Sequence, residues 1–129
     1  MSDGRTILLV EDDEDTRFAL RVRLTASGYV TREATDVDSA LAAVGRERPD
    51  LILLDLGLPG GGGLAVLERL GGAPDVVPIP VIVLSARPAA TARAAALAAG
   101  AAAFIEKLVD NRDLLTAIAG LLEPGRPQA

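Results

Sequence analysis

The chain has 129 residues, which is enough for one domain with a proper hydrophobic core and too few for two. Its formal net charge of -5 argues against direct nucleic-acid binding, which requires a basic surface to neutralise phosphates, and favours a cation as inorganic ligand. Cysteine and histidine are both absent, so disulfides, thiolate chemistry and the usual zinc ligands are excluded, and a bound metal would be held by oxygen atoms.

An acidic run follows the first predicted strand. The apolar run Thr6 to Val10 predicts a buried strand, and the acids Glu11 to Asp15 come directly after it. Acids at the start of a helix complement its macrodipole, and one of them can cap the helix, which explains part of the run. That explanation does not require acids at the end of the strand itself, where Glu11 and Asp12 lie.

Strand and helix patterns alternate along the rest of the chain. Tyr29 to Ala34 is a polar, weak strand, so we expect it at an edge of the sheet, and Thr35 or Asp36 is expected to cap the helix after it. Gly28 is expected just after the first helix. The predicted strands cover residues 6–10, 29–34, 51–54, 81–84 and 103–105, and the predicted helices cover about 14–27, 37–44, 64–70, 89–99 and 110–122.

This alternation of five strands with five helices indicates an α/β fold with a doubly wound, five-stranded parallel sheet. Right-handed crossovers put helices on both faces of such a sheet. We expect one domain over residues 1–123 and a disordered C-terminal tail over residues 124–129.

Polar side chains follow several of the predicted strands. Leu51 to Leu54 reads as a buried strand that ends at Asp55, and ligands of open α/β sheets bind at this carboxyl edge. An aspartate that only closes the strand and favours a turn is the alternative interpretation. The same edge collects Glu11 and Asp12 from the first strand, Ser85 from the fourth and Lys107 from the fifth.

Carboxylates gathered at one edge repel each other unless a cation lies among them. Mg²⁺ fits such a site best, because it takes oxygen ligands and keeps open positions for water or substrate. A lysine and a hydroxyl nearby can hold the remaining oxygens of a phosphoryl group. The predicted site therefore contains the parts needed for phosphoryl transfer to an aspartate.

Four sequence motifs carry a resemblance to a known family. ILLVEDDED, LILLDLGLPGGGG, VIVLSA and GAAAFIEK resemble the signatures of the receiver domain of two-component response regulators, and the similarity covers roughly residues 5 to 122. The resemblance implies a flavodoxin-like fold like that of the chemotaxis regulators, with strand order 2-1-3-4-5.

The resemblance also implies roles for single residues. Asp55 would be the phosphoacceptor, and Glu11, Asp12, Asp55 and the backbone carbonyl of Gly57 would bind Mg²⁺, with Mn²⁺ as a possible substitute. The other implied roles concern the phosphoryl group and the switch: Ser85 supplies the hydroxyl that turns toward the phosphoryl group, Lys107 is the lysine of the family motif, and Phe104 is the aromatic residue that moves with Ser85. The alternatives are a surface lysine for Lys107 and a core aromatic for Phe104.

Three positions depart from the family pattern. Gly62 stands where an acid or serine is usual, within the run Gly60 to Gly63, which is expected to form a mobile loop. Leu108 replaces the usual cis proline, so the peptide bond after Lys107 is expected to be trans. Gly57 offers no side chain to shield or hydrolyse a phosphoryl group.

These residues lead us to expect a phosphoacceptor switch, which is a substrate of its partner more than an enzyme. A pseudo-receiver that binds a partner without phosphorylation is the main alternative. A phosphatase of the haloacid dehalogenase type needs a second aspartate two residues after the first, where this chain has Gly57.

The expected phosphoryl donor is a sensor histidine kinase or a phosphotransfer protein. The expected output is a separate downstream protein or a fused effector, bound by the face of the alanine-rich helix, the last strand and the final helix. We expect a monomer or weak dimer, because this face offers Arg93 and no acid between Ala89 and Ala103. No signal peptide or membrane-spanning stretch is predicted, so a cytoplasmic location is expected; whether the chain stands alone or is part of a longer protein stays open.

Overall fold

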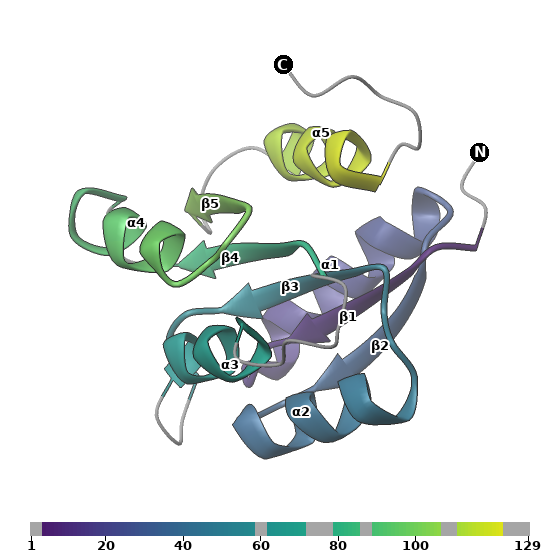
Figure 1. The fold of residues 1–129 in the computed structure, drawn as a ribbon. Helices are drawn as coiled ribbons and strands as arrows, with labels where there is room; N and C mark the ends of the chain where they lie inside the picture. Colours follow the sequence, from purple (N-terminus) through teal and green to yellow (C-terminus); the bar gives the residue numbers. More distant parts are fainter. Residues whose placement is uncertain (1–3, 59–61, 72–78, 86–88, 107–110, 123–129) are drawn as a thin grey trace.

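The computed structural model describes residues 4–58, 62–71, 79–85, 89–106 and 111–122, and Figure 1 shows strands and helices alternating along them. The strands are β1 (Thr6–Val10), β2 (Val30–Ala34), β3 (Leu51–Asp55), β4 (Val81–Ser85) and β5 (Ala103–Glu106). The helices are α1 (Glu14–Ala26), α2 (Val37–Arg46), α3 (Gly62–Gly71), α4 (Ala89–Ala98) and α5 (Asn111–Leu122).

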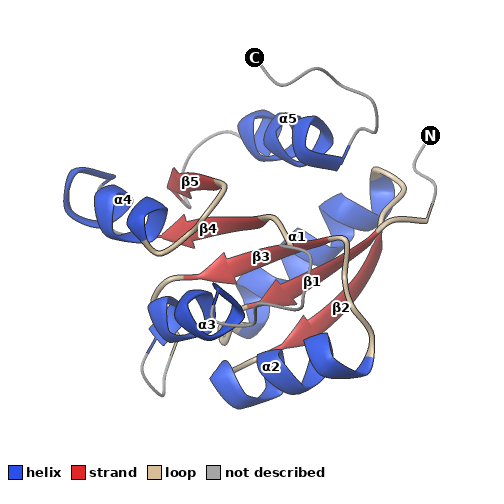
Figure 2. Ribbon diagram, in the orientation of Figure 1, coloured by secondary structure: helices blue, strands red, loops and turns tan. Residues whose placement is uncertain are grey.

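The strands form one parallel sheet in the order β2-β1-β3-β4-β5, which confirms the predicted flavodoxin-like order and places the polar strand β2 at an edge. All strand arrows in Figure 2 point to the same side of the molecule. Because the chain leaves every strand on that side, the residues that follow the strands gather along one edge of the sheet.

Two apolar clusters cover the two faces of the sheet. One cluster joins the strands to α1 and α5, for example through Leu24 and Ile118, and the other joins them to α2, α3 and α4, for example through Val66. Strand side chains alternate between the clusters, so that Leu53 faces α1 and α5 while Leu54 faces the opposite side. All five residues of β3 are buried, so the strand that ends at the candidate site is surrounded by packed side chains.

The helix ends agree with the capping signals in the sequence. Asp13 caps α1, and its carboxylate accepts a hydrogen bond from a first-turn amide. Gly28 follows that helix with a φ of 96°, in the left-handed region that favours glycine. Asp36, and not Thr35, caps α2, where it forms a capping box with Ser39.

The structure differs from the sequence prediction at the start of α3. This helix begins at Gly62 instead of Leu64, so Gly62 and Gly63 belong to its first turn and do not form part of a loop. Several predictions concern residues outside the described part of the chain: those on Gly60, Gly61, Lys107, the peptide bond to Leu108 and the C-terminal tail. Among the described helices, none combines the length and the apolar character needed to cross a membrane.

Candidate functional site

The strand register brings the predicted site residues together. Val10 of β1 pairs with Leu54 of β3, so Glu11, which directly follows β1, comes next to Asp55, the last residue of β3. Asp55 pairs in turn with Leu84 of β4, the residue before Ser85. This parallel pairing explains how residues far apart in the sequence reach one edge of the sheet.

Glu11, Asp12 and Asp55 form an acidic cluster. Each contributes a carboxylate oxygen, and these three atoms lie within 4.8 Å of one another. Glu11 and Asp55 are buried, with 2% and 6% of their surface exposed, whereas Asp12 is exposed. The cluster is therefore enclosed by the protein at Glu11 and Asp55 and reaches solvent at Asp12.

The main chain around Asp55 holds its carboxylate in a defined position. Its Oδ1 accepts a hydrogen bond from the amide of Gly57 at 3.1 Å. The amide of Leu56 donates to the carbonyl oxygen of Leu84 at 3.0 Å, which continues the pairing of β3 with β4 for one residue beyond Asp55. A side chain at Gly57 would start 3.8 Å from Asp55 Oδ1, so this position borders the acceptor oxygen directly.

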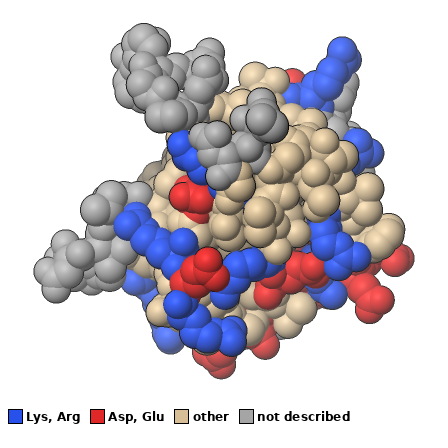
Figure 3. Space-filling model, turned by 90° about the vertical axis from the view of Figure 1, so that its right-hand side faces the viewer, with Lys and Arg blue, Asp and Glu red and all other residues tan. Residues whose placement is uncertain are grey.

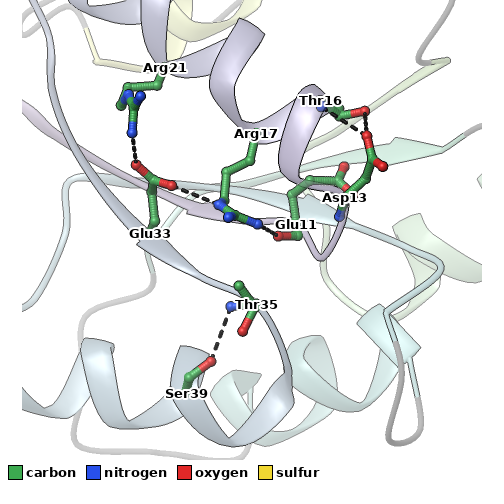
Figure 4. Close-up of polar contacts among 8 residues, drawn as sticks. All are labelled: Glu11, Asp13, Thr16, Arg17, Arg21, Glu33, Thr35 and Ser39. Atoms are coloured by element: carbon green, nitrogen blue, oxygen red, sulfur yellow. Dashed lines mark hydrogen bonds and ion pairs between the residues drawn. The ribbon is translucent and has the colours of Figure 1, made fainter.

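Glu11 is held through both its main chain and its side chain. Its amide donates to the carbonyl oxygen of Ala34 on β2 at 3.0 Å, and its Oε2 accepts from the amide of Asp13 at 3.0 Å. Its other carboxylate oxygen, Oε1, is completely buried. Asp13 itself points its carboxylate at Thr16 in the first turn of α1 (Figure 4).

The donor set fits a hard divalent cation. All three side chains offer carboxylate oxygens, two of them in a buried setting where uncompensated negative charge is costly. A cation between them would offset the mutual repulsion. The geometry thus supports a divalent-ion site built by Glu11, Asp12 and Asp55.

Ser85 ends β4, the strand beside β3, and Phe104 lies on the next strand, β5. Both are buried, at 3% and 7% exposure. Phe104 pairs with Val83 and shares its apolar cluster with Ala96 of α4, and strand alternation puts Ser85 on the same face as Val83. Ser85 therefore connects the strand edge at the site with the face covered by α4.

Two features of the site were missed in the sequence. Arg17 of α1 donates a hydrogen bond to the carbonyl oxygen of Glu11 at 2.9 Å (Figure 4), a contact that depends on how α1 packs against the sheet. Gly63 lies against the main chain of Asp55, and the glycine run gave no sign of which glycine makes this approach.

On the face drawn in Figure 3, acidic and basic side chains lie next to one another across the lower half, so its described part offers no continuous basic surface.

Comparison with known proteins agrees with the family resemblance seen in the sequence. The model of the family described as "Response regulator receiver domain" matches residues 7–119. Response regulator MprA of Mycobacterium leprae is 38% identical over 121 residues, which cover 94% of this chain and 52% of MprA. The phosphate regulon transcriptional regulatory protein PhoB of Pseudomonas aeruginosa is 35% identical over 129 residues, which cover 98% of this chain and 56% of PhoB. The chain thus spans about half the length of these relatives.

The solved structures give the same result at the level of the fold. The beryllofluoride-activated N-terminal receiver domain of RstA from Klebsiella pneumoniae matches with a TM-score of 0.86 at 27% identity, over 92% of this chain and 99% of that one.

Proposed function

Because the chain belongs to the response regulator receiver domain family, we propose that Asp55 is the residue on which it accepts a phosphoryl group. The observation that carries this proposal is the acidic cluster: Asp55 lies at the end of the central strand, and the carboxylates of Glu11 and Asp12 are within 4.8 Å of its own. Asp12 is the exposed member of the cluster, so a donor can approach from its side.

The transfer is a substitution at phosphorus. A carboxylate oxygen of Asp55 forms a bond to the phosphorus atom of a phosphohistidine, the P–N bond of the donor breaks, and the electron pair leaves with the imidazole ring. The product is an acyl phosphate on Asp55. The hydrogen bond from the Gly57 amide to Asp55 Oδ1 at 3.1 Å orients the carboxylate before the reaction.

We assign the cation to Mg²⁺, with Mn²⁺ as a substitute, and its ligands to Glu11, Asp12, Asp55 and the backbone carbonyl of Gly57. When bound, the ion supplies positive charge against the carboxylates and the phosphoryl oxygens. Burial of Glu11 and Asp55 makes this compensation stronger than it would be in water, because the effective dielectric constant is lower there.

The switch is assigned to Ser85 and Phe104, with Lys107 as the cation that holds a phosphoryl oxygen. The common face of Ser85, Phe104 and α4 supports this assignment, since a shift of the Ser85 hydroxyl toward Asp55 changes the packing beneath α4. The output surface is then the face of α4, β5 and α5. Leu97 and Leu121 are exposed on these helices, at 39% and 38%.

A receiver domain implies a histidine kinase, directly or through a phosphotransfer protein, as its partner. On the output side we propose a separate protein or an effector domain fused to the receiver, as the greater length of MprA and PhoB suggests for those proteins. We place the domain in the cytoplasm, where ATP is available to such kinases. We assign the receiver domain to residues 1–123.

Incubation with acetyl phosphate, with and without Mg²⁺, tests the proposal by intact-protein mass. A phosphoacceptor gains one phosphoryl group in a Mg²⁺-dependent reaction. A pseudo-receiver, which works without phosphorylation, shows no gain under either condition.

A further inference from the structure

The peptide unit between Glu11 and Asp12 is fixed by a side chain from α1. Its carbonyl oxygen, which belongs to Glu11, accepts a hydrogen bond from Nη1 of Arg17 at 2.9 Å. Because a peptide unit is planar, fixing its carbonyl restrains the residues on both sides of it. These two residues carry two of the three carboxylates of the acidic cluster.

Arg17 is held in turn from the edge of the sheet. Its Nε donates to Oε1 of Glu33 on β2 at 2.7 Å, and Nη1 of Arg21 donates to the other Glu33 oxygen at 3.0 Å. Figure 4 shows the Arg17 guanidinium between Glu33 and Glu11. Only 16% of the Arg17 side chain is exposed, so the group lies in a largely enclosed position.

The ionisation of Glu33 strengthens this arrangement. Partial burial raises the pKa of its carboxyl group, but hydrogen bonds from Arg17 and Arg21 and the charges of both guanidinium groups outweigh burial and hold the pKa below its usual value. The planar guanidinium of Arg17 holds Nε and Nη1 in a fixed geometry. The hydrogen bond from Nε to the Glu33 carboxylate therefore sets the direction in which Nη1 donates to the Glu11 carbonyl.

We propose that Arg17 is a positioning residue for the cation site, acting through the main chain of Glu11 and Asp12. The role rests on the proposed function, since it concerns Mg²⁺ bound by those two residues. Charge alone gives the opposite expectation: an arginine near a cation site repels the cation, so removing it would strengthen Mg²⁺ binding. The sign of the change therefore separates positioning from simple electrostatics.

The experiment compares Arg17→Met with Arg21→Met. Both variants remove one positive charge from α1 and one hydrogen bond to Glu33, but only Arg17 contacts Glu11. Calorimetric titration with Mg²⁺, and Mn²⁺ binding followed by electron paramagnetic resonance, give the affinities. We expect Arg17→Met to weaken binding roughly tenfold, as is typical when a supporting group of a metal site is lost, and Arg21→Met to change it less than about twofold.

Two further measurements distinguish the positioning role of Arg17 from a general loss of folding in Arg17→Met. Arg17→Lys keeps the charge but lacks the planar pair of donors, so its affinity should lie between those of the wild type and Arg17→Met. Amide hydrogen exchange in EDTA should be faster at Asp12 and Asp13 in the Arg17 variants and unchanged in Arg21→Met, independently of any metal.

Unchanged or tighter Mg²⁺ binding by Arg17→Met or Arg17→Lys, or an equal loss in Arg21→Met, would overturn the role of Arg17. Failure of the wild type to bind Mg²⁺ at millimolar concentration would instead overturn the cation site itself, and the positioning role with it.

Discussion

Gly63, in the first turn of α3, lies directly against the main chain of Asp55. A Cβ atom added at Gly63 would be 2.6 Å from the carbonyl oxygen of Asp55 and 2.9 Å from Cα of Leu56. The Gly63 amide also donates to the carbonyl oxygen of Leu56 at 3.0 Å. The start of α3 and the end of β3 therefore meet through backbone atoms, which cannot move aside as a flexible side chain can.

Gly63→Ala should consequently destabilise the domain by about 1–3 kcal/mol, the usual cost of overpacking, and slow its phosphorylation, because α3 or Asp55 has to shift. Gly57→Ala is the matched control: among the described residues its Cβ would meet only Asp55 Oδ1, at 3.8 Å, and its stability should change by about 1 kcal/mol or less. Urea unfolding measures both variants. Equal stability of Gly63→Ala and the wild type would mean that Gly63 does not lie tightly against the main chain of Asp55 and Leu56.

Mg²⁺ should stabilise the folded domain, because its proposed ligands form a cluster in the native state and are apart in the unfolded chain. At ten times the dissociation constant the gain is about 1.4 kcal/mol, visible as a rise in melting temperature. Asp12→Ala should melt above the wild type in EDTA, since one of three mutually repelling carboxylates is gone, and should gain less from Mg²⁺. An equal Mg²⁺ response in both proteins would argue against Asp12 as a ligand.

The Arg17–Glu33 pair should contribute stability near neutral pH and lose it in acid. The pKa of Glu33 is lowered in the folded state, so its contribution is present above the unfolded value, about 4.3, and disappears as pH falls through the lower folded value. Wild type should exceed Glu33→Gln in unfolding free energy by roughly 0.5–1 kcal/mol at pH 7, and the difference should shrink toward pH 3. If the advantage of the wild type over Glu33→Gln in unfolding free energy increased as the pH fell, this prediction would be contradicted.

The activated domain should remain largely monomeric when alone. In α4 the described side chains include exposed Arg93 and Leu97 but no acid, so two copies of this helix cannot pair with each other through opposite charges. Sedimentation velocity with beryllofluoride and Mg²⁺, which together mimic the phosphorylated state, gives the assembly state. A tight dimer at micromolar concentration that Leu97→Ser disrupts would contradict this prediction.

The sequence predicted most of the fold because its signals are local. Buried strands such as Leu51 to Leu54 are apolar runs, and Asp36 marks the start of α2 through its capping box. The acidic cluster was also predictable, since parallel strands must bring Glu11 and Asp55 to one edge.

The supporting contacts were not predictable in the same way. Arg17 and Glu33 are sixteen positions apart, and their pairing depends on how α1 lies against β2. Nothing local distinguishes Arg17 from Arg21 on the same helix, although only Arg17 contacts Glu11. A run of glycines favours a loop, so the sequence predicts a loop at Gly63, whereas the contact of Gly63 with Asp55 depends on tertiary packing.

The central claim is that Asp55 carries the phosphoryl group, and the most direct measurement compares wild type with Asp55→Asn. Both proteins are incubated with acetyl phosphate and Mg²⁺, and intact mass is followed over time. The wild type should gain a single phosphoryl group, and Asp55→Asn, which keeps the shape but lacks the carboxylate nucleophile, should gain none. If Asp55→Asn gained one phosphoryl group at a rate similar to that of the wild type, Asp55 would not be the acceptor.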